Sequence, residues 1–331
     1  MTTANFPFLL QRFFTAQLMG DQGASPHTVA GYRDTLRLLL RFAMDRLHRA
    51  PSDLRLQDVD AEFVADFLQH LEVERGNCTR TRNTRLAALH SFFRYVALCE
   101  PAHGLQCQRV LAVPAKRYER GPVAFLTQEE TEALVSTPDA ETWIGRRDRA
   151  LLLMAVQTGL RNSEITSLRS RDVELGVGAH VRCLGKGRKA RCTPLRPDVA
   201  AVLEAWLQEV SGNPDDPVFP SSRGGRLSAD ALQRLVVRHS ATASSRCPSL
   251  VGKKVTPHTL RHTAAMDLLR CGVDLSVIAL WLGHESIGST QAYLHADMRL
   301  KERALAHATS SGVVPERYCA PDPLLAFLET L

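Results

Sequence analysis

Apolar residues return at helical spacing through the first third of the chain. After Ser25-Pro26, a pair that suits a helix cap followed by proline in the first turn, apolar side chains recur every three or four residues between Val29 and Leu47. Similar patterns run from about Asp60 to Leu71 and from about Thr79 to Leu98, and a shorter helix is expected nearer the N-terminus. The pattern therefore predicts an all-helical first domain that ends near Val113.

The pattern changes after this domain. Residues 114–122 (PAKRYERGP) have a proline at each end, four charged side chains and no apolar period, which is typical of an exposed linker. A capping box at residues 127–130, Thr-Gln-Glu-Glu, then starts a second domain. Its helical patterns are interrupted by two predicted strands, 179–184 and 191–195, on either side of the glycine-rich turn 185–189.

We therefore expect a mainly α protein with a small β region (α+β). Its predicted parts are a helical domain in residues 1–113, a linker in 114–122, a mixed domain in 123–310 and a tail in 311–331.

Composition narrows the class of protein. An apolar content of 44% is enough for packed cores, and 41 Lys and Arg against 35 Asp and Glu give a net charge of +6, a mild bias toward polyanions such as nucleic acid. The eight cysteines include no C-x-x-C pair and are expected to be reduced. The N-terminus lacks a signal-peptide pattern, and the most apolar stretch, residues 151–156, is too short to span a bilayer. We expect a soluble, cytoplasmic protein with no membrane partner.

Six basic or nucleophilic side chains stand in short motifs of the second domain. They are Arg161, Lys186, His258, Arg261, His284 and Tyr293. His258 and Arg261 are three residues apart, so they share one face of a helix. Each of the six alone fits an ordinary structural role, such as core packing or a local hydrogen bond. Their occurrence together and in this order indicates a chemical site.

The segments around these residues resemble the tyrosine recombinases, also called the lambda-integrase family. The matching motifs are TGLRNSEITSL, LGKGRKARCTPL, TPHTLRHTAA and LGHESIGSTQAYLHAD, spread from about Phe125 to His307. In the first domain, SPHTVAGYRDTLRLL and NTRLAALHSFFRYV are similar to the family's core-binding domain. The last catalytic-domain motif, followed by KERALA, is most similar to integrases carried on bacterial mobile elements.

The resemblance implies that the six residues form an active site on one DNA phosphate. Arg161 and Arg261 would hold the non-bridging oxygens, because planar guanidinium forks match phosphate geometry. His284 would be a third donor. Such preorganised charge stabilises the negative charge that gathers on the phosphate as it is attacked.

The same resemblance assigns the bond-making and proton-transfer steps. Tyr293, a phenol with an ordinary pKa of about 10, would attack the phosphate, with His258 as its proton acceptor. Lys186 would give a proton to the departing 5′ oxygen. The product would be a covalent 3′-phosphotyrosine that keeps the energy of the broken bond. No metal, ATP or other cofactor is therefore expected.

Other residues are expected to support this site or the DNA. Glu164 would orient an active-site side chain, or act only as an acid in the first turn of a helix. His262 and His295 are candidates to support the reacting residues, although His262 is rather expected to pack or to hydrogen-bond locally. Arg80, Arg82 and Arg85 would contact DNA phosphates from the first domain, or form a solvated charged face.

The family implies double-stranded DNA as the partner and a homo-oligomer, a tetrameric synapse on DNA, or assembly with related recombinases. The apolar tail segment 324–328 would then dock on a neighbouring subunit; a terminal helix packed on its own domain fits equally well.

The leading function is thus a site-specific recombinase: an integrase, a tyrosine-type transposase or a resolvase. One alternative is a type IB topoisomerase, which uses the same tyrosine chemistry but is disfavoured by the integrase-like first domain. The other is a non-catalytic DNA-binding regulator that keeps the fold, which the complete set of six residues disfavours.

Overall fold

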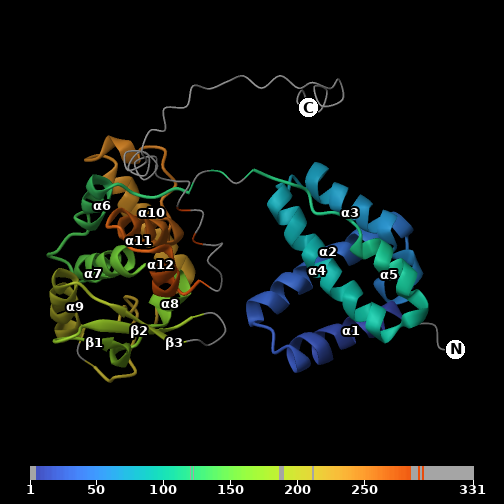
Figure 1. Ribbon diagram of the computed structural model, residues 1–331, viewed down its shortest axis with the longest axis horizontal. Helices are drawn as coiled ribbons and strands as arrows, with labels where there is room; N and C mark the ends of the chain where they lie inside the picture. The colour runs from blue at the N-terminus through green and yellow to red at the C-terminus, as the bar shows by residue number, and fades with distance from the viewer. Residues whose placement is uncertain are drawn as a thin grey trace, which may run out of the picture. The chain divides into compact units, whose positions relative to one another are not determined.

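The computed structural model of this chain describes residues 5–119, 121, 123–185, 190–210, 212–284, 290 and 293. The chain divides into two compact units, Met1–Arg120 and Gly121–Leu331, each with its own hydrophobic core (Figure 1). Helices dominate both units and one small sheet accompanies them, so the predicted fold class is confirmed. Within the described ranges, no helix has both the length and the apolar character that crossing a bilayer requires.

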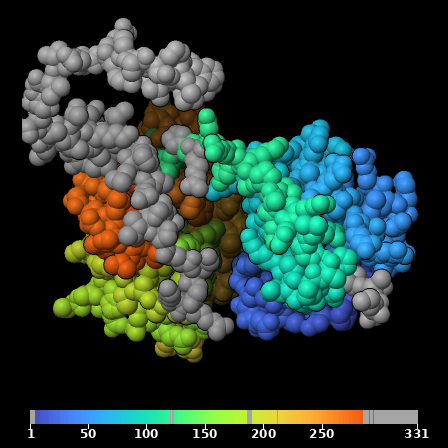
Figure 2. All heavy atoms as spheres, turned by 45° about the vertical axis from the view of Figure 1, so that its right-hand side comes forward, coloured from blue at the N-terminus to red at the C-terminus, as the bar shows by residue number. Residues whose placement is uncertain are grey.

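The first unit is helical. Its helices are α1 (Phe6–Arg12), a π-helix (Phe13–Asp21), α2 (Pro26–Leu47), α3 (Ala61–Val73), α4 (Thr79–Cys99) and α5 (Gly104–Leu111). Local signals define their starts: Thr28 N donates to Ser25 Oγ at 3.2 Å before α2, and Phe63 N donates to Asp60 Oδ1 at 2.8 Å before α3. Aliphatic and aromatic side chains fill one core, and the atoms of this unit form a continuous body in Figure 2 (blue to green).

The second unit adds a three-stranded antiparallel sheet. Its helices are α6 (Gln128–Val135), α7 (Trp143–Thr158), α8 (Asn162–Ser167), α9 (Pro197–Val210), α10 (Ala229–Ala243), α11 (Pro257–Arg270) and α12 (Leu275–Leu282). Its strands are β1 (Val173–Glu174), β2 (His180–Leu184) and β3 (Ala190–Pro194), in the order β1-β2-β3. The sequence predicted the second and third strands; the two-residue β1 carried too little pattern to be recognised.

Helix α11 is a central helix of the second unit. It packs against α7, α10 and α12. Its small residues Ala264 and Ala265 are buried, which lets neighbouring backbone approach closely. At its middle, Thr263 Oγ1 accepts a hydrogen bond of 2.9 Å from Leu126 N, which ties the helix to the segment before α6. The residues of the His258–His262 motif therefore project from a fixed element.

Candidate active site

Two glycine turns bring distant parts of the second unit together. Gly159 ends α7 and Gly283 ends α12, both with positive φ, 62° and 64°. A Cβ on Gly159 would lie 2.7 Å from Leu282 Cδ2, so the two helix ends approach as closely as glycine allows. The carbonyl groups of these turns point toward the candidate arginines.

The two candidate arginines bind these carbonyls. Arg261, only 3% exposed, donates from Nη1 to Gly159 O and from Nη2 to Leu282 O, each at 2.6 Å. Arg161 Nη2 donates to Gly283 O at 2.8 Å. A guanidinium has five N–H donors, so these bonds fix both groups and leave donors for a further anion. Arg161 and Arg261 thus bind the place where the two glycine turns meet, although they are a hundred positions apart in sequence.

Two guanidiniums with little access to water make the place where these turns meet electropositive. Burial, and then the positive charge of Arg161, lower the pKa of Arg261 to about 10. Arg261 therefore keeps its charge at neutral pH, in a poorly solvated position beside a second cation. An anion bound there is attracted more strongly than at an exposed site, because less water screens the charges.

The carboxylate of Glu164 binds Arg161 and a further arginine, Arg191. It is 4% exposed, and it accepts hydrogen bonds from Arg161 N at 2.7 Å and Arg161 Nη1 at 2.9 Å. Its two oxygens also accept from Arg191 Nη1 and Nη2, at 3.0 and 2.7 Å. Burial alone would raise the pKa of Glu164, but the hydrogen bonds from Arg191 and Arg161 hold it below its ordinary value. The carboxylate is therefore ionised and shared by two guanidiniums.

Arg191 was not singled out from the sequence. It lies on β3 opposite Cys183 of β2, and its guanidinium reaches Gly283: a Cβ there would meet Arg191 Nη1 at 2.6 Å. Burial opposes its charge, yet the hydrogen bonds with Glu164 raise the pKa of Arg191. One sequence feature could have identified Arg191. It is an arginine at the start of the predicted strand 191–195, on the same face as Thr193, which is buried.

Tyr293 lies at the centre of three histidines. It is 2% exposed, and its hydroxyl is 2.9 Å from His262 Nδ1. The His284 ring stacks against it at 6.4 Å and 12°, and His284 Nδ1 lies 2.8 Å from Thr290 Oγ1. The His258 ring is 4.2 Å from the His262 ring. The chain thus gathers His258, His262, His284 and Tyr293 beside Arg261.

The electrostatics keep these groups neutral. Burial first, and then the neighbouring basic groups, lower the pKa of His262 and of His284 to about 4 each. Burial raises the pKa of Tyr293, although Arg261 acts in the opposite direction. At physiological pH the phenol is therefore protonated and both imidazoles are uncharged.

The remaining predicted residues lie elsewhere. Lys186 falls between the last residue of β2 and the first of β3, outside the described residues, as do the tail residues 311–331. In the first unit Arg82 is 6% exposed and donates from Nη1 to Pro114 O at 2.9 Å. Arg85 Nη1 donates to Gly31 O at 3.1 Å, whereas Arg80 is exposed. Arg82 and Arg85 thus make structural bonds, and Arg80 is the most accessible of the three.

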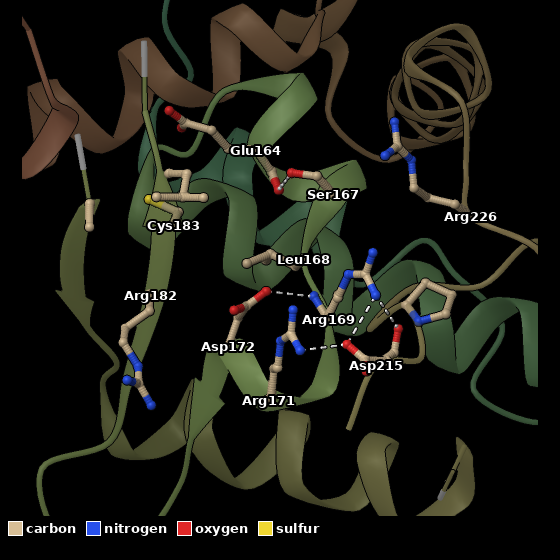
Figure 3. Close-up of a pocket in the computed structure, with 13 residues that line it drawn as sticks. Glu164, Ser167, Leu168, Arg169, Arg171, Asp172, Arg182, Cys183, Asp215 and Arg226 are labelled. Carbon is tan, nitrogen blue, oxygen red and sulfur yellow. Dashed lines mark hydrogen bonds and ion pairs between the residues drawn. The ribbon is translucent and has the colours of Figure 1, made fainter. Parts of the chain in front are cut away.

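A cavity of about 770 Å³ is lined in part by Glu164 (Figure 3). Arg169 and Arg171 line it, and both pair with Asp215, at 3.0 and 2.6 Å. Among the described residues that line this cavity, neither Arg261 nor Tyr293 occurs. Nor do the described residues include a group of three or more His, Cys, Asp or Glu side chains able to hold a metal ion. The described lining of this cavity is therefore distinct from the arginine–histidine–tyrosine cluster, with Glu164 bordering both.

Comparisons with known proteins point to one family. A family model described as phage integrase family matches residues 124–299, and one described as phage integrase, N-terminal SAM-like domain, matches residues 11–98. A protein of Sinorhizobium fredii (strain NBRC 101917 / NGR234), named as an integrase/recombinase, is 52% identical over 323 residues, which are 98% of this chain and 97% of that relative.

Solved structures share the fold. The XerH site-specific recombinase bound to a palindromic difH substrate, a post-cleavage complex, matches with a TM-score of 0.69 and 24% identity over 86% of this chain and 81% of that chain. A lambda integrase tetramer bound to a Holliday junction matches with a TM-score of 0.65 and 18% identity over 88% of this chain and 78% of that chain.

Proposed function

Because this chain belongs to the phage integrase family of tyrosine recombinases, we propose that Tyr293 is the nucleophile with which it cuts and rejoins DNA. The chain is an enzyme of site-specific recombination. One observation carries the assignment of the nucleophile: the buried Tyr293 hydroxyl lies against an imidazole of α11, the helix that also supplies Arg261. The proposed active site is Arg161, Lys186, His258, Arg261, His284 and Tyr293.

The arginine pair supports a phosphate site. Arg161 and Arg261 are fixed by backbone carbonyls and repel one another in a poorly solvated position. A phosphodiester between them would relieve this repulsion and receive donors whose geometry is already set. Preorganised charge of this kind typically lowers a reaction barrier by about 3 kcal/mol per donor. His284, stacked on Tyr293, is close enough to the nucleophile to add a third donor.

The proposed reaction conserves the bond energy of the DNA strand. The Tyr293 oxygen forms a bond to phosphorus while the bond from phosphorus to the 5′ oxygen breaks. The tyrosine loses its proton, and Lys186 gives one to the departing 5′ oxygen. The enzyme is left with a 3′-phosphotyrosine, and attack by a 5′-hydroxyl from the same or another strand reverses the steps.

A nicked suicide substrate tests the nucleophile. The DNA would carry the sequences that flank the gene, and cleavage would release a short 5′ fragment that diffuses away and traps the covalent complex. Wild-type protein should give a protein–DNA adduct and Tyr293→Phe should give none. Tyr118→Phe, at an exposed tyrosine, is the matched control and should behave like wild type. An adduct with Tyr293→Phe would refute the assignment.

The partners follow from the same proposal. The solved lambda integrase complex is a tetramer on a Holliday junction, and we infer that this chain also binds double-stranded DNA in the cytoplasm and assembles as a tetrameric synapse, with itself or with related recombinases. Its DNA is expected to be a bacterial mobile element. Inverted repeats or an element boundary beside the gene would support this role, and a chromosomal site with neither would count against it.

The tail is proposed to join subunits. Residues 324–328 are apolar and would dock on a neighbouring catalytic domain. Deleting the chain from Ala320 onward should weaken synapsis, measured by native gel electrophoresis of paired DNA sites, and spare binding to a single site. Unchanged synapsis would instead indicate a terminal helix packed on its own domain.

A further inference from the structure

The hydroxyl of Tyr293 lies within hydrogen-bond distance of the His262 imidazole. His262 Nδ1 lies 2.9 Å from the Tyr293 oxygen, and the two rings meet edge to face at 5.5 Å and 67°. His262 directly follows Arg261 on α11. One element therefore positions a guanidinium for the phosphate and an imidazole for the nucleophile, in adjacent residues.

His258 occupies a different place. It lies one helical turn before His262, is exposed, and contacts the His262 ring with a centroid separation of 4.2 Å. The sequence interpretation made His258 the proton acceptor because of its motif position. The structure has His262 in hydrogen-bond reach of the phenol, which is the first requirement for a general base.

The surroundings of His262 favour proton acceptance once DNA is bound. Burial disfavours its charged form most, followed by His258 and Arg261 on α11 and by His284 after α12. The imidazole is thus neutral, and in the tautomer that carries its proton on Nε2, Nδ1 accepts from the phenol. A phosphodiester held by Arg161 and Arg261 brings negative charge beside the ring, and negative charge favours the imidazolium. Entry of the phosphate would therefore make His262 a stronger base.

We propose that His262 is a further catalytic residue of this recombinase, the group that takes the proton of Tyr293. The proposal rests on the proposed role of Tyr293 as nucleophile. During cleavage the O–H bond of Tyr293 breaks, its proton moves to His262 Nδ1, and the oxygen's electron pair forms the bond to phosphorus. During rejoining the phosphorus–tyrosine bond breaks and the imidazolium returns the proton to the phenolate.

Two substitutions separate proton transfer from positioning. His262→Phe removes both the hydrogen bond and the base. His262→Asn keeps an oxygen close to the position of Nδ1, so it can hold the hydroxyl but cannot take its proton. The measurement is the single-turnover rate of adduct formation on the nicked substrate at saturating protein. Since a general base typically contributes 10²- to 10⁴-fold, both variants should be slower by about 100-fold or more.

A more acidic nucleophile provides the decisive readout. A trifluorinated tyrosine at position 293 ionises near neutral pH, so it needs no base. If His262 takes the proton, this replacement should restore the cleavage rates of His262→Phe and His262→Asn. Both should come to within about tenfold of the rate of the fluorinated wild type, because the reaction no longer depends on a general base. A structural role would not respond to the acidity of the phenol.

The outcomes are distinct. The proposal is overturned if His262→Phe cleaves at the wild-type rate or if His262→Asn is fully active. It is also overturned if the fluorinated tyrosine does not restore the lost rate. Unchanged thermal unfolding and DNA binding of the variants would show that they fold. Absence of a Tyr293-dependent adduct in the wild type would instead overturn the proposed function. His258→Phe, measured in parallel, should not be restored by the fluorinated tyrosine.

Discussion

Arg191 and Glu164 form a buried ion pair through two hydrogen bonds of 3.0 and 2.7 Å, although 27 positions separate them. The same carboxylate accepts from Arg161, and the Arg191 guanidinium lies against Gly283, whose carbonyl Arg161 also binds. β3, which carries Arg191, begins at Ala190, four residues after Lys186 in the sequence. The pair therefore joins β3 to Arg161, which we propose to bind the phosphate.

Removing the charge of Glu164 should be costly for both stability and cleavage. Glu164→Gln leaves two guanidiniums with a neutral partner, and breaking a buried pair typically costs about 3–5 kcal/mol of unfolding free energy. All three tryptophans lie in the second unit, so their fluorescence in urea reports its unfolding. Cleavage should fall as well, because Arg161 loses its support.

The surface provides a matched control for this substitution. Arg146 donates to both oxygens of Glu209 at 2.8 and 2.6 Å, the same two-bond geometry at a more exposed site. Glu209→Gln should leave the unfolding midpoint nearly unchanged, because water screens exposed pairs. Equal effects of the two substitutions would contradict a special role for the buried pair.

Gly159 should not tolerate a methyl group. Its Cβ would lie 2.7 Å from Leu282 Cδ2 and 3.1 Å from Ala264 Cβ, and the shift would move a carbonyl that binds Arg261. Gly176 also has positive φ, 91°, but a Cβ there meets nothing within 4 Å. Gly176→Ala should cost about 1 kcal/mol from backbone strain alone, and Gly159→Ala should cost more and slow adduct formation. Equal costs in urea unfolding would argue against the close contact.

Lys186 should be required only when the leaving group needs a proton. Lys186→Ala should slow cleavage by about 10²- to 10⁴-fold, the usual contribution of a general acid. A substrate with sulfur in place of the bridging 5′ oxygen should restore the rate, because a thiolate leaves without protonation. Lys189→Ala, three residues later in the sequence, is the control and should cleave both substrates normally. A Lys186→Ala defect that persists with the sulfur substrate would assign Lys186 another role.

Acid should destabilise the second unit through its histidines. The pKa of His262 and of His284 is about 4 in the folded chain, against an ordinary value of about 6.5. As pH falls through 6.5 the unfolded chain binds these protons first, so their contribution to stability is complete above this pH and is lost between about 6.5 and 4. The urea midpoint should therefore fall from pH 7 to pH 5, and less steeply in His262→Phe. Identical slopes would show that His262 is not responsible.

Several features of this protein could be predicted from local sequence, because they depend on residues within one or two turns of each other. The cap at Ser25 and the capping box at Thr127 are both present, and the helical periodicity and mainly α fold are confirmed. The order of the motifs also indicated the family, because it is a property of the sequence and does not depend on how the chain folds. Local signals succeed here because a helix start is decided by neighbouring backbone donors and the side chains that accept from them.

The contacts that assemble the site could not be read in this way. For His262 the sequence favoured a local bond over a supporting role at the site, but it contacts Tyr293, 31 residues later. Arg191 was overlooked because its partner Glu164 lies on another element, and Arg261 is fixed by the carbonyl of Gly159, 102 residues earlier. Periodicity decides which face of a helix is buried and not what is buried against it. The sequence alone therefore determined the kind of chemistry and the residues available for it, whereas tertiary packing decided which imidazole meets the phenol and which carboxylate holds the arginines.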